Sequence, residues 1–216
     1  MMNKTRILLV RHGESEGNVL GVFTGHSGYP LTEMGHKQAE LTADYIGKNY
    51  KVDAVYSSDL PRAFQTAEHI AHVFDLPVVT DHRFREIRAA KWERKTFDIL
   101  GDLFPEDYAV WVNDTTNARC TGGESVREVA DRVVQGIMDV AAAHSGQCIV
   151  IAAHATPIRA SLWKIAGGTP ELFQKYNFGC NCAISELVFE DGKISIVSAN
   201  QAAHLQGCKT QLPSNI

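Results

Sequence analysis

An arginine and a histidine follow a short apolar run near the start of the chain. Ile7–Val10 is followed directly by Arg11, His12 and Gly13. A guanidinium favours an anion, and an imidazole can act as a nucleophile, a base or a metal ligand. The competing interpretation is a strand end with two solvated polar residues and a glycine turn. The pair alone therefore favours a functional site only slightly.

Two further apolar runs end in residues that could share this chemistry. Ser57 and Ser58 end one run, with Arg62 one helical turn later, and Cys148–Ala153 is followed by His154. If the three runs are neighbouring parallel strands, their carboxyl ends meet where ligands bind in open α/β sheets. Two arginines, two imidazoles and a helix N-terminus would there form a cage for a dianion such as a phosphate ester. Taken singly, Arg62 is typical of a helix surface and His154 of a strand end.

The elements that must position these residues follow an alternating pattern along the chain. Apolar runs alternate with helical periodicity, which indicates an α/β fold with a mostly parallel central sheet, arranged as a three-layer α/β/α sandwich. A hairpin signal at Asp191-Gly192 adds a late antiparallel strand. The expected strands are 7–10, 53–57, 77–80, 148–153, 184–189 and 193–197. The expected helices are 32–48 capped by Thr32, one capped by Asp59 that ends before Pro77, one after the Ser125–Glu128 capping box, and 158–165.

The segment at about 83–121 has the least regular pattern. Its aromatic residues lack a helical or strand period, so we expect short helices and loops that cover a substrate. No linker of Pro, Ser or Gly and no internal repeat divides the chain, which predicts one domain over residues 1–216.

Composition excludes several classes of protein. The 216 residues carry a net charge of −4, so there is no overall basic field for nucleic acid. No stretch approaches the ~20 apolar residues of a membrane span, and Met1–Arg6 lacks the apolar core of a signal peptide. Five scattered cysteines favour reduced thiols and a cytoplasmic protein. Cys180 and Cys182 have no matching second pair, so we expect no metal site there.

Five blocks of the chain resemble the signature of the histidine phosphatase superfamily, the phosphoglycerate-mutase-like clan. They occur in the family's order and span about residues 7–165, which makes coincidence a weak explanation. The blocks are Leu9–Ser15 with Asn18, Ser57–Leu60 with Arg62–Ala63 and Gln65–Ala67, Arg85–Ile87 with Trp92–Glu93, Gly122–Ser125, and His154.

The resemblance implies hydrolysis of small phosphomonoesters through a phosphohistidine on His12, without a metal or another cofactor. The second ring nitrogen of His12 would need a fixed acceptor, such as a backbone carbonyl. Glu86 would protonate the leaving alkoxide and then activate water; the competing interpretation is a surface glutamate near several arginines. The implied catalytic residues are His12, Glu86, Arg11, Arg62 and His154. The implied substrate and phosphate contacts are Arg11, Asn18, Thr24, Gly25, Arg62, Glu86, His154 and Ala155.

The chain departs from the family's pattern at four positions. Gly17 stands where an aromatic residue is usual, and Ala90, Arg94 and Ala155 stand where glycine is usual. None of these changes removes a side chain that the implied mechanism needs. They therefore bear on substrate preference more than on the reaction. If Ala155 needed a positive φ, its backbone would be strained.

Two alternatives to a phosphatase remain open at this point. The first is a phosphotransferase of the phosphoglycerate mutase type. The resemblance implies, however, that such mutases have longer chains, with an extra segment and a C-terminal tail. The second, of another class, is a catalytically inactive regulatory protein that binds a phosphate ligand. In each case the expected partner is a small-molecule phosphate ester, with no nucleic acid and no membrane. The oligomeric state stays open, with a homodimer as one option.

Overall fold

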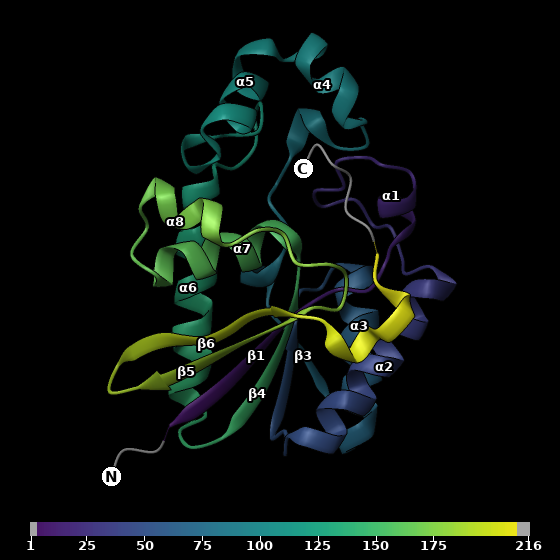
Figure 1. Ribbon diagram of the computed structural model, residues 1–216, viewed down its shortest axis with the longest axis vertical. Helices are drawn as coiled ribbons and strands as arrows, with labels where there is room; N and C mark the ends of the chain where they lie inside the picture. The colour runs from purple at the N-terminus through teal and green to yellow at the C-terminus, as the bar shows by residue number, and fades with distance from the viewer. Residues whose placement is uncertain (1–3, 211–216) are drawn as a thin grey trace.

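The computed structural model describes residues 4–210. A six-stranded sheet with the order β3-β2-β4-β1-β5-β6 runs through its centre (Figure 1). Along the chain the elements are β1 (Thr5–Arg11), α1 (Glu16–Val19), α2 (Glu33–Asn49), β2 (Ala54–Ser57), α3 (Pro61–Phe74), β3 (Val78–Thr80), α4 (Phe97–Leu103), α5 (Pro105–Asn113), α6 (Val126–Ala143), β4 (Cys148–Ala153), α7 (Ala155–Ile165), α8 (Pro170–Lys175), β5 (Ile184–Glu190) and β6 (Lys193–Gln201). No helix in this part of the chain is both long and apolar enough to cross a bilayer.

The strand directions confirm a mostly parallel sheet. β3, β2, β4 and β1 pair in parallel, whereas β5 pairs antiparallel with both β1 and β6. β5 is thus the one strand among residues 4–210 that runs against the others. Asp191 and Gly192 form the predicted turn, both with positive φ.

Helices cover both faces of the sheet, which confirms the three-layer α/β/α sandwich. Successive side chains of a strand point to opposite faces. Ile7 and Leu9 of β1 therefore pack in one core with α6 and α7, and Leu8 and Val10 pack in the other with α2 and α3. All four side chains are almost completely buried. Burial of such side chains stabilises the sandwich by roughly 1.5–3 kcal/mol each.

The helix caps were predicted correctly at two of three sites. Thr32 accepts from the N–H of Gly35 at the start of α2, and Ser125 forms its capping box with Glu128. The prediction that Asp59 caps α3 is wrong. α3 begins at Pro61, whose fixed φ suits a first helical position without a side-chain cap. The carboxylate of Asp59 pairs instead with a distant arginine.

The carboxyl ends of β2, β4 and β1 lie level at one edge of the sheet. Arg11 pairs with Ala153, and Ser57 with Ala152. The next residues continue the ladder, because the N–H of His12 donates to the Ala153 carbonyl at 3.0 Å. The adjacency on which the expected convergence depended is therefore present in the fold.

The segment at 83–121 consists of short helices and turns, as expected. α4 and α5 form a lobe at the top of Figure 1, away from the body of the sheet. Phe23, from the loop after α1, packs edge-on against Trp92 and Trp111. This aromatic contact fastens the lobe to the loop beside the strand ends.

The structure shows the backbone conformation or the space available at the four positions that depart from the family's pattern. Ala90 has φ 47° and Arg94 φ 63°, the left-handed region that favours glycine. Each costs the fold roughly 1–3 kcal/mol as a non-glycine residue. Ala155 is the first residue of α7 and lies outside that region, so it carries no such strain. A Cβ on Gly17 would lie 2.8 Å from the ring of Tyr29, which fills the space of any larger side chain.

Candidate active site

Four cationic or imidazole side chains meet at the level strand ends. Arg11 ends β1 with His12 directly after it, His154 follows β4, and Arg62 lies in the first turn of α3. The rings of His12 and His154 have their centroids 5.1 Å apart. All four residues are buried. The topology thus brings together residues that are 142 positions apart in the chain (12 to 154).

The ring of His12 is fixed in one tautomer. Its Nδ1 lies 2.6 Å from the carbonyl oxygen of Gly13. A carbonyl only accepts, so Nδ1 carries the proton and Nε2 keeps its lone pair. Burial, followed by the charges of Arg62 and Arg11, lowers the pKa of His12 well below 6.5. The imidazole is therefore neutral at pH 7 and available as a nucleophile.

Gly13 allows the loop after β1 to pass against α2. A Cβ at this position would lie 2.4 Å from the carbonyl oxygen of Gly35. The N–H of Gly13 also donates to Oγ1 of Thr66 on α3, at 3.0 Å. α2 and α3 thus fix the position of Gly13, whose carbonyl orients His12.

The two arginines are anchored by backbone carbonyls. Nη1 and Nη2 of Arg62 donate to the carbonyls of Ser27 and Gly25, each at 2.9 Å, and Nη1 of Arg11 donates to that of Gly179 at 2.5 Å. Burial is the main cause that lowers the pKa of both, that of Arg62 to about 10, so both stay charged at pH 7. Within residues 4–210 neither forms an ion pair, and the buried Nε of each has no partner.

His154 is the second buried imidazole of the cluster. Its Nε2 lies 2.8 Å from Oγ of Ser58, which itself accepts from the N–H of Leu60 at 3.2 Å. The Ser58 hydroxyl can donate to Nε2, and in that tautomer the ring proton resides on Nδ1. That Nδ1 is buried and has no partner among the described residues. Burial, then Arg62 and His12, lowers the pKa of His154 well below 6.5.

Glu86 is buried beside the arginines, which contradicts the interpretation of a surface glutamate. Its side chain is 6% exposed and interacts electrostatically with Arg11 and Arg62. Its Oε1 accepts from the N–H of Ile87 at 2.7 Å, and its Oε2 lies 3.4 Å from the N–H of Thr156. The neighbouring arginines bind elsewhere: Arg83 to Asp81 and Asp139, Arg85 to Asp59, and Arg88 to the Gly122 carbonyl.

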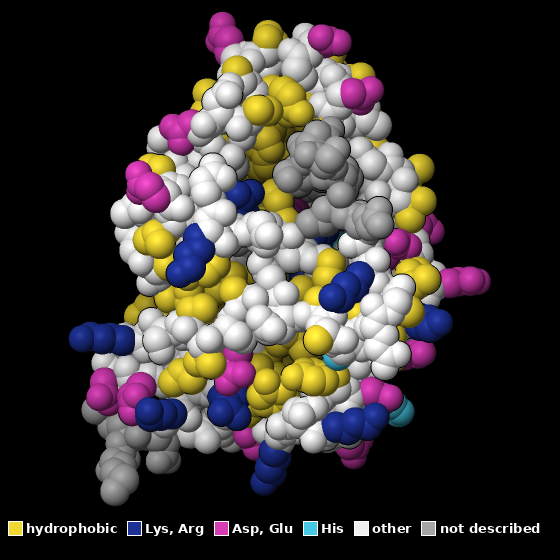
Figure 2. All heavy atoms as spheres, in the orientation of Figure 1, with side chains coloured by type: hydrophobic (Ala, Val, Ile, Leu, Met, Phe, Trp, Pro, Cys, Tyr) yellow, Lys and Arg dark blue, Asp and Glu magenta, His cyan; other side chains and the backbone are white. Residues whose placement is uncertain are grey.

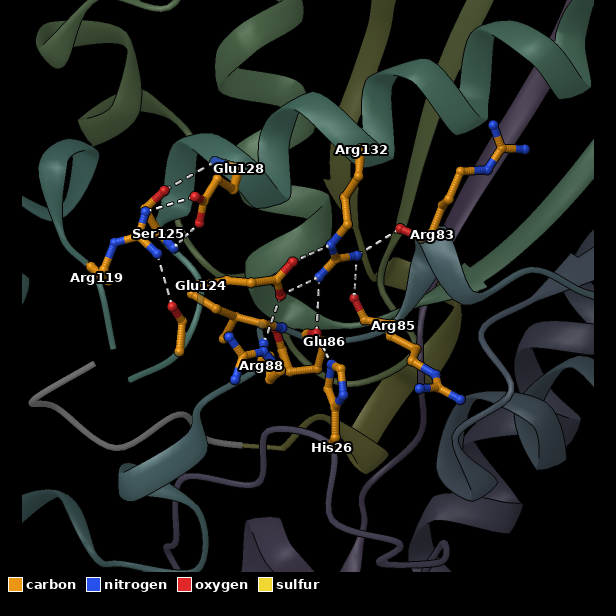
Figure 3. A network of polar contacts seen from close by, with 12 residues as sticks. His26, Arg83, Arg85, Glu86, Arg88, Arg119, Glu124, Ser125, Glu128 and Arg132 are labelled. Carbon is orange, nitrogen blue, oxygen red and sulfur yellow. Dashed lines mark hydrogen bonds and ion pairs between the residues drawn. The ribbon is translucent and has the colours of Figure 1, made fainter. Parts of the chain in front are cut away.

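A clamp on α6 fixes the backbone of Glu86 (Figure 3). Arg132 donates to the carbonyls of Arg83, Arg85 and Glu86 at 2.6, 2.8 and 2.9 Å. The same guanidinium also donates to both carboxylate oxygens of Glu124, at 2.9 and 3.0 Å. His26, to which the sequence assigned no role, lies with Nε2 2.8 Å from the Glu86 carbonyl. Arg132 was missed because nothing in its local sequence marks it.

Asn18 is held so that its amide nitrogen donates to no residue within 4–210. Its Oδ1 accepts from the N–H of Ser15 at 3.1 Å and from Nδ2 of Asn181 at 3.2 Å. Asn181 also donates to the His12 carbonyl at 3.0 Å and is completely buried. Asn181 was not predicted from the sequence, although one signal was present: it comes just before the antiparallel strand β5. The start of an antiparallel strand lies at the edge where the parallel strands end.

A cavity adjoins this cluster. Of the remaining residues predicted to contact substrate, two line the cavity and one does not. Thr24 and Ala155 line it, together with Arg11 and Asn18. Gly25 does not: its φ is +47°, a Cβ there would lie 2.7 Å from the Glu93 carboxylate, and its carbonyl holds Arg62. Gly25 therefore anchors Arg62 through its carbonyl and does not line the cavity.

The lowered histidine pKa values predict how stability depends on pH. The unfolded chain binds protons near pH 6.5, whereas His12 and His154 bind them only at lower pH when folded. The stability present above 6.5 is thus lost as pH falls below it, by about 1.4 kcal/mol per pH unit for each histidine. His69 and His204 act in the same direction.

Urea unfolding between pH 7.5 and 5 measures this loss. His154→Gln should reduce the pH slope by one histidine's contribution, whatever it does to the absolute stability. A free energy of unfolding that stays constant over this range would contradict the burial of neutral imidazoles.

The arrangement can attack an anionic phosphorus centre. It combines a neutral imidazole whose Nε2 keeps its lone pair, two guanidinium charges, a second imidazole and a buried carboxyl group. The N-terminus of α7, with its positive dipole end, begins at Ala155 beside them. Among residues 4–210 no group of three His, Cys, Asp or Glu side chains is arranged to hold a metal, and all five cysteines are free.

Comparison with known proteins gives consistent matches over almost the whole chain. The family model of the histidine phosphatase superfamily, branch 1, matches residues 7–202. Phosphoserine phosphatase 1 of Hydrogenobacter thermophilus is 33% identical over 93% of this chain and 94% of its own. The Entamoeba histolytica phosphoserine phosphatase, solved with phosphoserine, gives a TM-score of 0.81 at 30% identity, over 93% and 99% of the two chains. A mycobacterial glucosyl-3-phosphoglycerate phosphatase gives 0.83 at 25%, over 93% and 100%.

Proposed function

The chain belongs to the histidine phosphatase superfamily, and on that basis we propose that it hydrolyses small phosphomonoesters through a phosphohistidine on His12. Its relatives named as phosphatases, one of them called metal-independent, support a phosphomonoesterase that uses no cofactor. The geometry of the individual side chains supports the roles proposed for them below.

One observation supports the proposal most strongly. Three buried nitrogens that have no partner among residues 4–210, Nε of Arg11, Nε of Arg62 and Nδ1 of His154, belong to the cluster around His12. Buried polar groups are normally paired, and an unpaired one costs about 1–3 kcal/mol. A phosphate dianion has enough acceptor oxygens for all three donors and balances both guanidinium charges. The free Nδ2 of Asn18 supplies a further donor.

In the first step Nε2 of His12 attacks phosphorus as the bond to the alkoxide oxygen breaks. Glu86 gives its proton to that oxygen, and the alcohol leaves. The Nδ1–H bond to the Gly13 carbonyl stabilises the positive ring of the phosphohistidine. The two arginines and His154 hold the three non-bridging oxygens, on which the transition state spreads its charge.

In the second step Glu86, now a carboxylate, takes a proton from water. The water oxygen bonds to phosphorus, the bond to Nε2 breaks, and phosphate leaves with the starting protonation restored. Burial of Glu86 beside both guanidinium groups, which hold the phosphate in this proposal, supports its role in both steps. The same group serves as acid and then as base.

The fate of the phosphoryl group separates hydrolysis from transfer. The purified protein is incubated with a phosphomonoester and 3-phosphoglycerate in EDTA, and phosphate and 2-phosphoglycerate are measured. We expect phosphate alone, at the rate found without EDTA. Production of 2-phosphoglycerate with little phosphate would establish the mutase alternative. No product from a broad ester panel would favour the inactive regulatory protein.

Arg132→Met is expected to slow hydrolysis of alkyl phosphates by up to about 10²-fold, because a misplaced catalytic group can cost that much. Without the clamp, three backbone carbonyls around Glu86 each lose the donor that Arg132 supplies, and that of Glu86 keeps only His26. In kcat/KM, which reports the phosphorylation of His12, p-nitrophenyl phosphate should be affected far less, since nitrophenolate leaves without a proton. The ratio of kcat/KM values for the two esters measures the effect.

Arg127→Met is the matched control on the same helix, since Arg127 is exposed and faces Asn117. It should leave the ratio unchanged. Equal slowing of both esters in Arg132→Met would indicate a general loss of structure and would contradict the positioning of Glu86 by Arg132.

Two wider proposals accompany this function. We propose that residues 1–216 form one domain, because a single sheet takes its strands from residues 5 to 201. We also propose a cytoplasmic location, which the five free thiols favour.

A further inference from the structure

The cavity beside the cluster has two chemically different ends. Its polar end is formed by Arg11, Asn18, Thr156 and Asn181, which adjoin or contact His12 and Glu86. Because this end holds the phosphate in the proposed function, the opposite end faces the alcohol part of the ester. What lines that end therefore selects the alcohol.

Aromatic and aliphatic side chains line the opposite end. Val22 and Phe23 come from the loop after α1, Phe97 starts α4, and Trp111 belongs to α5. The ring of Phe23 lies 5.5 Å from that of Phe97 and 5.3 Å from that of Trp111, measured between centroids. In Figure 2 hydrophobic side chains fill a hollow beneath the α4 and α5 lobe.

Charge is missing from this end in the described part of the chain. Arg11 is the single ionisable residue that lines the cavity there, and the phosphate uses it. Residues 211–216, Gln-Leu-Pro-Ser-Asn-Ile, contain no cationic side chain. Lys209 is exposed, and its charge acts on Cys180 and His204. A carboxylate in the alcohol part would lose water without gaining a cation.

We propose that the apolar end is a leaving-group site for a ring-sized apolar alcohol. The chain then prefers esters whose alcohol carries neither a carboxylate nor an ammonium group. This inference rests on the proposed phosphatase function. It sets the substrate apart from phosphoserine, which the names of several relatives carry.

The test compares kcat/KM for 2-phenylethyl phosphate, phosphoserine, 3-phosphoglycerate and methyl phosphate, with p-nitrophenyl phosphate as the measure of general activity. 2-Phenylethanol is a weaker acid than the serine hydroxyl, so intrinsic reactivity favours phosphoserine. We nevertheless expect 2-phenylethyl phosphate to exceed phosphoserine by roughly 10-fold or more, from burial of its ring.

Two variants locate the preference in the cavity. Phe97→Ala should lower kcat/KM for 2-phenylethyl phosphate by about 10-fold and leave methyl phosphate unchanged. Val22→Lys should move the preference toward phosphoserine and 3-phosphoglycerate by supplying a cation. Val112→Lys is the matched control, because Val112 is 60% exposed on α5 and does not line the cavity.

The outcomes distinguish this inference from the function on which it rests. Hydrolysis of p-nitrophenyl phosphate with phosphoserine equal to or better than 2-phenylethyl phosphate would overturn the apolar site alone. So would a Phe97→Ala variant with an unchanged preference. Failure to release phosphate from any of the five esters would overturn the phosphatase function and the inference together.

Discussion

His12→Ala is expected to reduce phosphate release from every phosphomonoester by about 10⁴-fold or more, because no other described group can take its place as nucleophile. The free Nε2 of His12 lies among two guanidinium groups and a second imidazole, whereas His154 has its Nε2 engaged by Ser58. Steady-state phosphate release, measured with an activated and an unactivated ester, gives the loss.

The fold should survive this substitution. His12 is 3% exposed, but its neighbours are the polar groups of the site and it belongs to none of the hydrophobic cores. The substitution also removes a buried imidazole whose protonation disfavours folding at low pH. We therefore expect cooperative unfolding near the wild-type temperature. His72→Ala, on the exposed side of α3, is the matched control and should retain full activity. Unfolding of His12→Ala at a much lower temperature would contradict this placement.

Glu86→Gln is expected to slow hydrolysis of alkyl phosphates by roughly 10²–10⁴-fold, the usual contribution of a general acid. Glu86→Gln should affect the two steps differently when the leaving group of the ester needs no protonation. Nitrophenolate leaves unaided, so His12 is still phosphorylated, while the loss of the base slows attack by water. Rapid mixing with p-nitrophenyl phosphate should therefore show a burst of one nitrophenolate per site, followed by slow turnover.

Glu68→Gln, at an exposed glutamate of α3, should show neither effect. Equal slowing for all esters without a burst would contradict the double role of Glu86. It would leave Glu86 as a carboxyl group that only balances the positive charge of Arg11 and Arg62.

Much of the sheet and the convergence at its edge could be predicted from the sequence. The apolar runs that became β1 and β4 are buried on both faces, so their hydrophobic pattern is continuous and their ends are sharp. An arginine or histidine directly after such a run has to lie where the strand emerges. This local rule located Arg11, His12 and His154, and the family resemblance added Glu86.

Contacts between distant segments were beyond the local sequence. Asp59 has the composition of a helix cap, yet Pro61 sets the start of α3 and Arg85 takes the carboxylate. Arg132 contacts carbonyls 46 to 49 residues away. A backbone carbonyl carries no sequence signature, so its partner could not be identified from residue types.

The departures from the family's pattern also needed the structure. Gly17 and Ala155 line the cavity, whereas Arg94 lies beside Tyr29 and Pro30, outside it. Ala90 and Arg94 bear on backbone strain, because both have positive φ. Only two of the four departures therefore border the cavity in which we propose that substrate binds.

Trapping the phosphoenzyme tests the central claim most directly. The protein is mixed with a ³²P-labelled phosphomonoester, quenched in alkali, digested and analysed by mass spectrometry. The mechanism predicts a phosphoryl group on the peptide that contains His12, stable in alkali and lost in acid. The label should accumulate in Glu86→Gln and be absent from His12→Ala. A label on another residue, or one that persists in His12→Ala, would contradict the account.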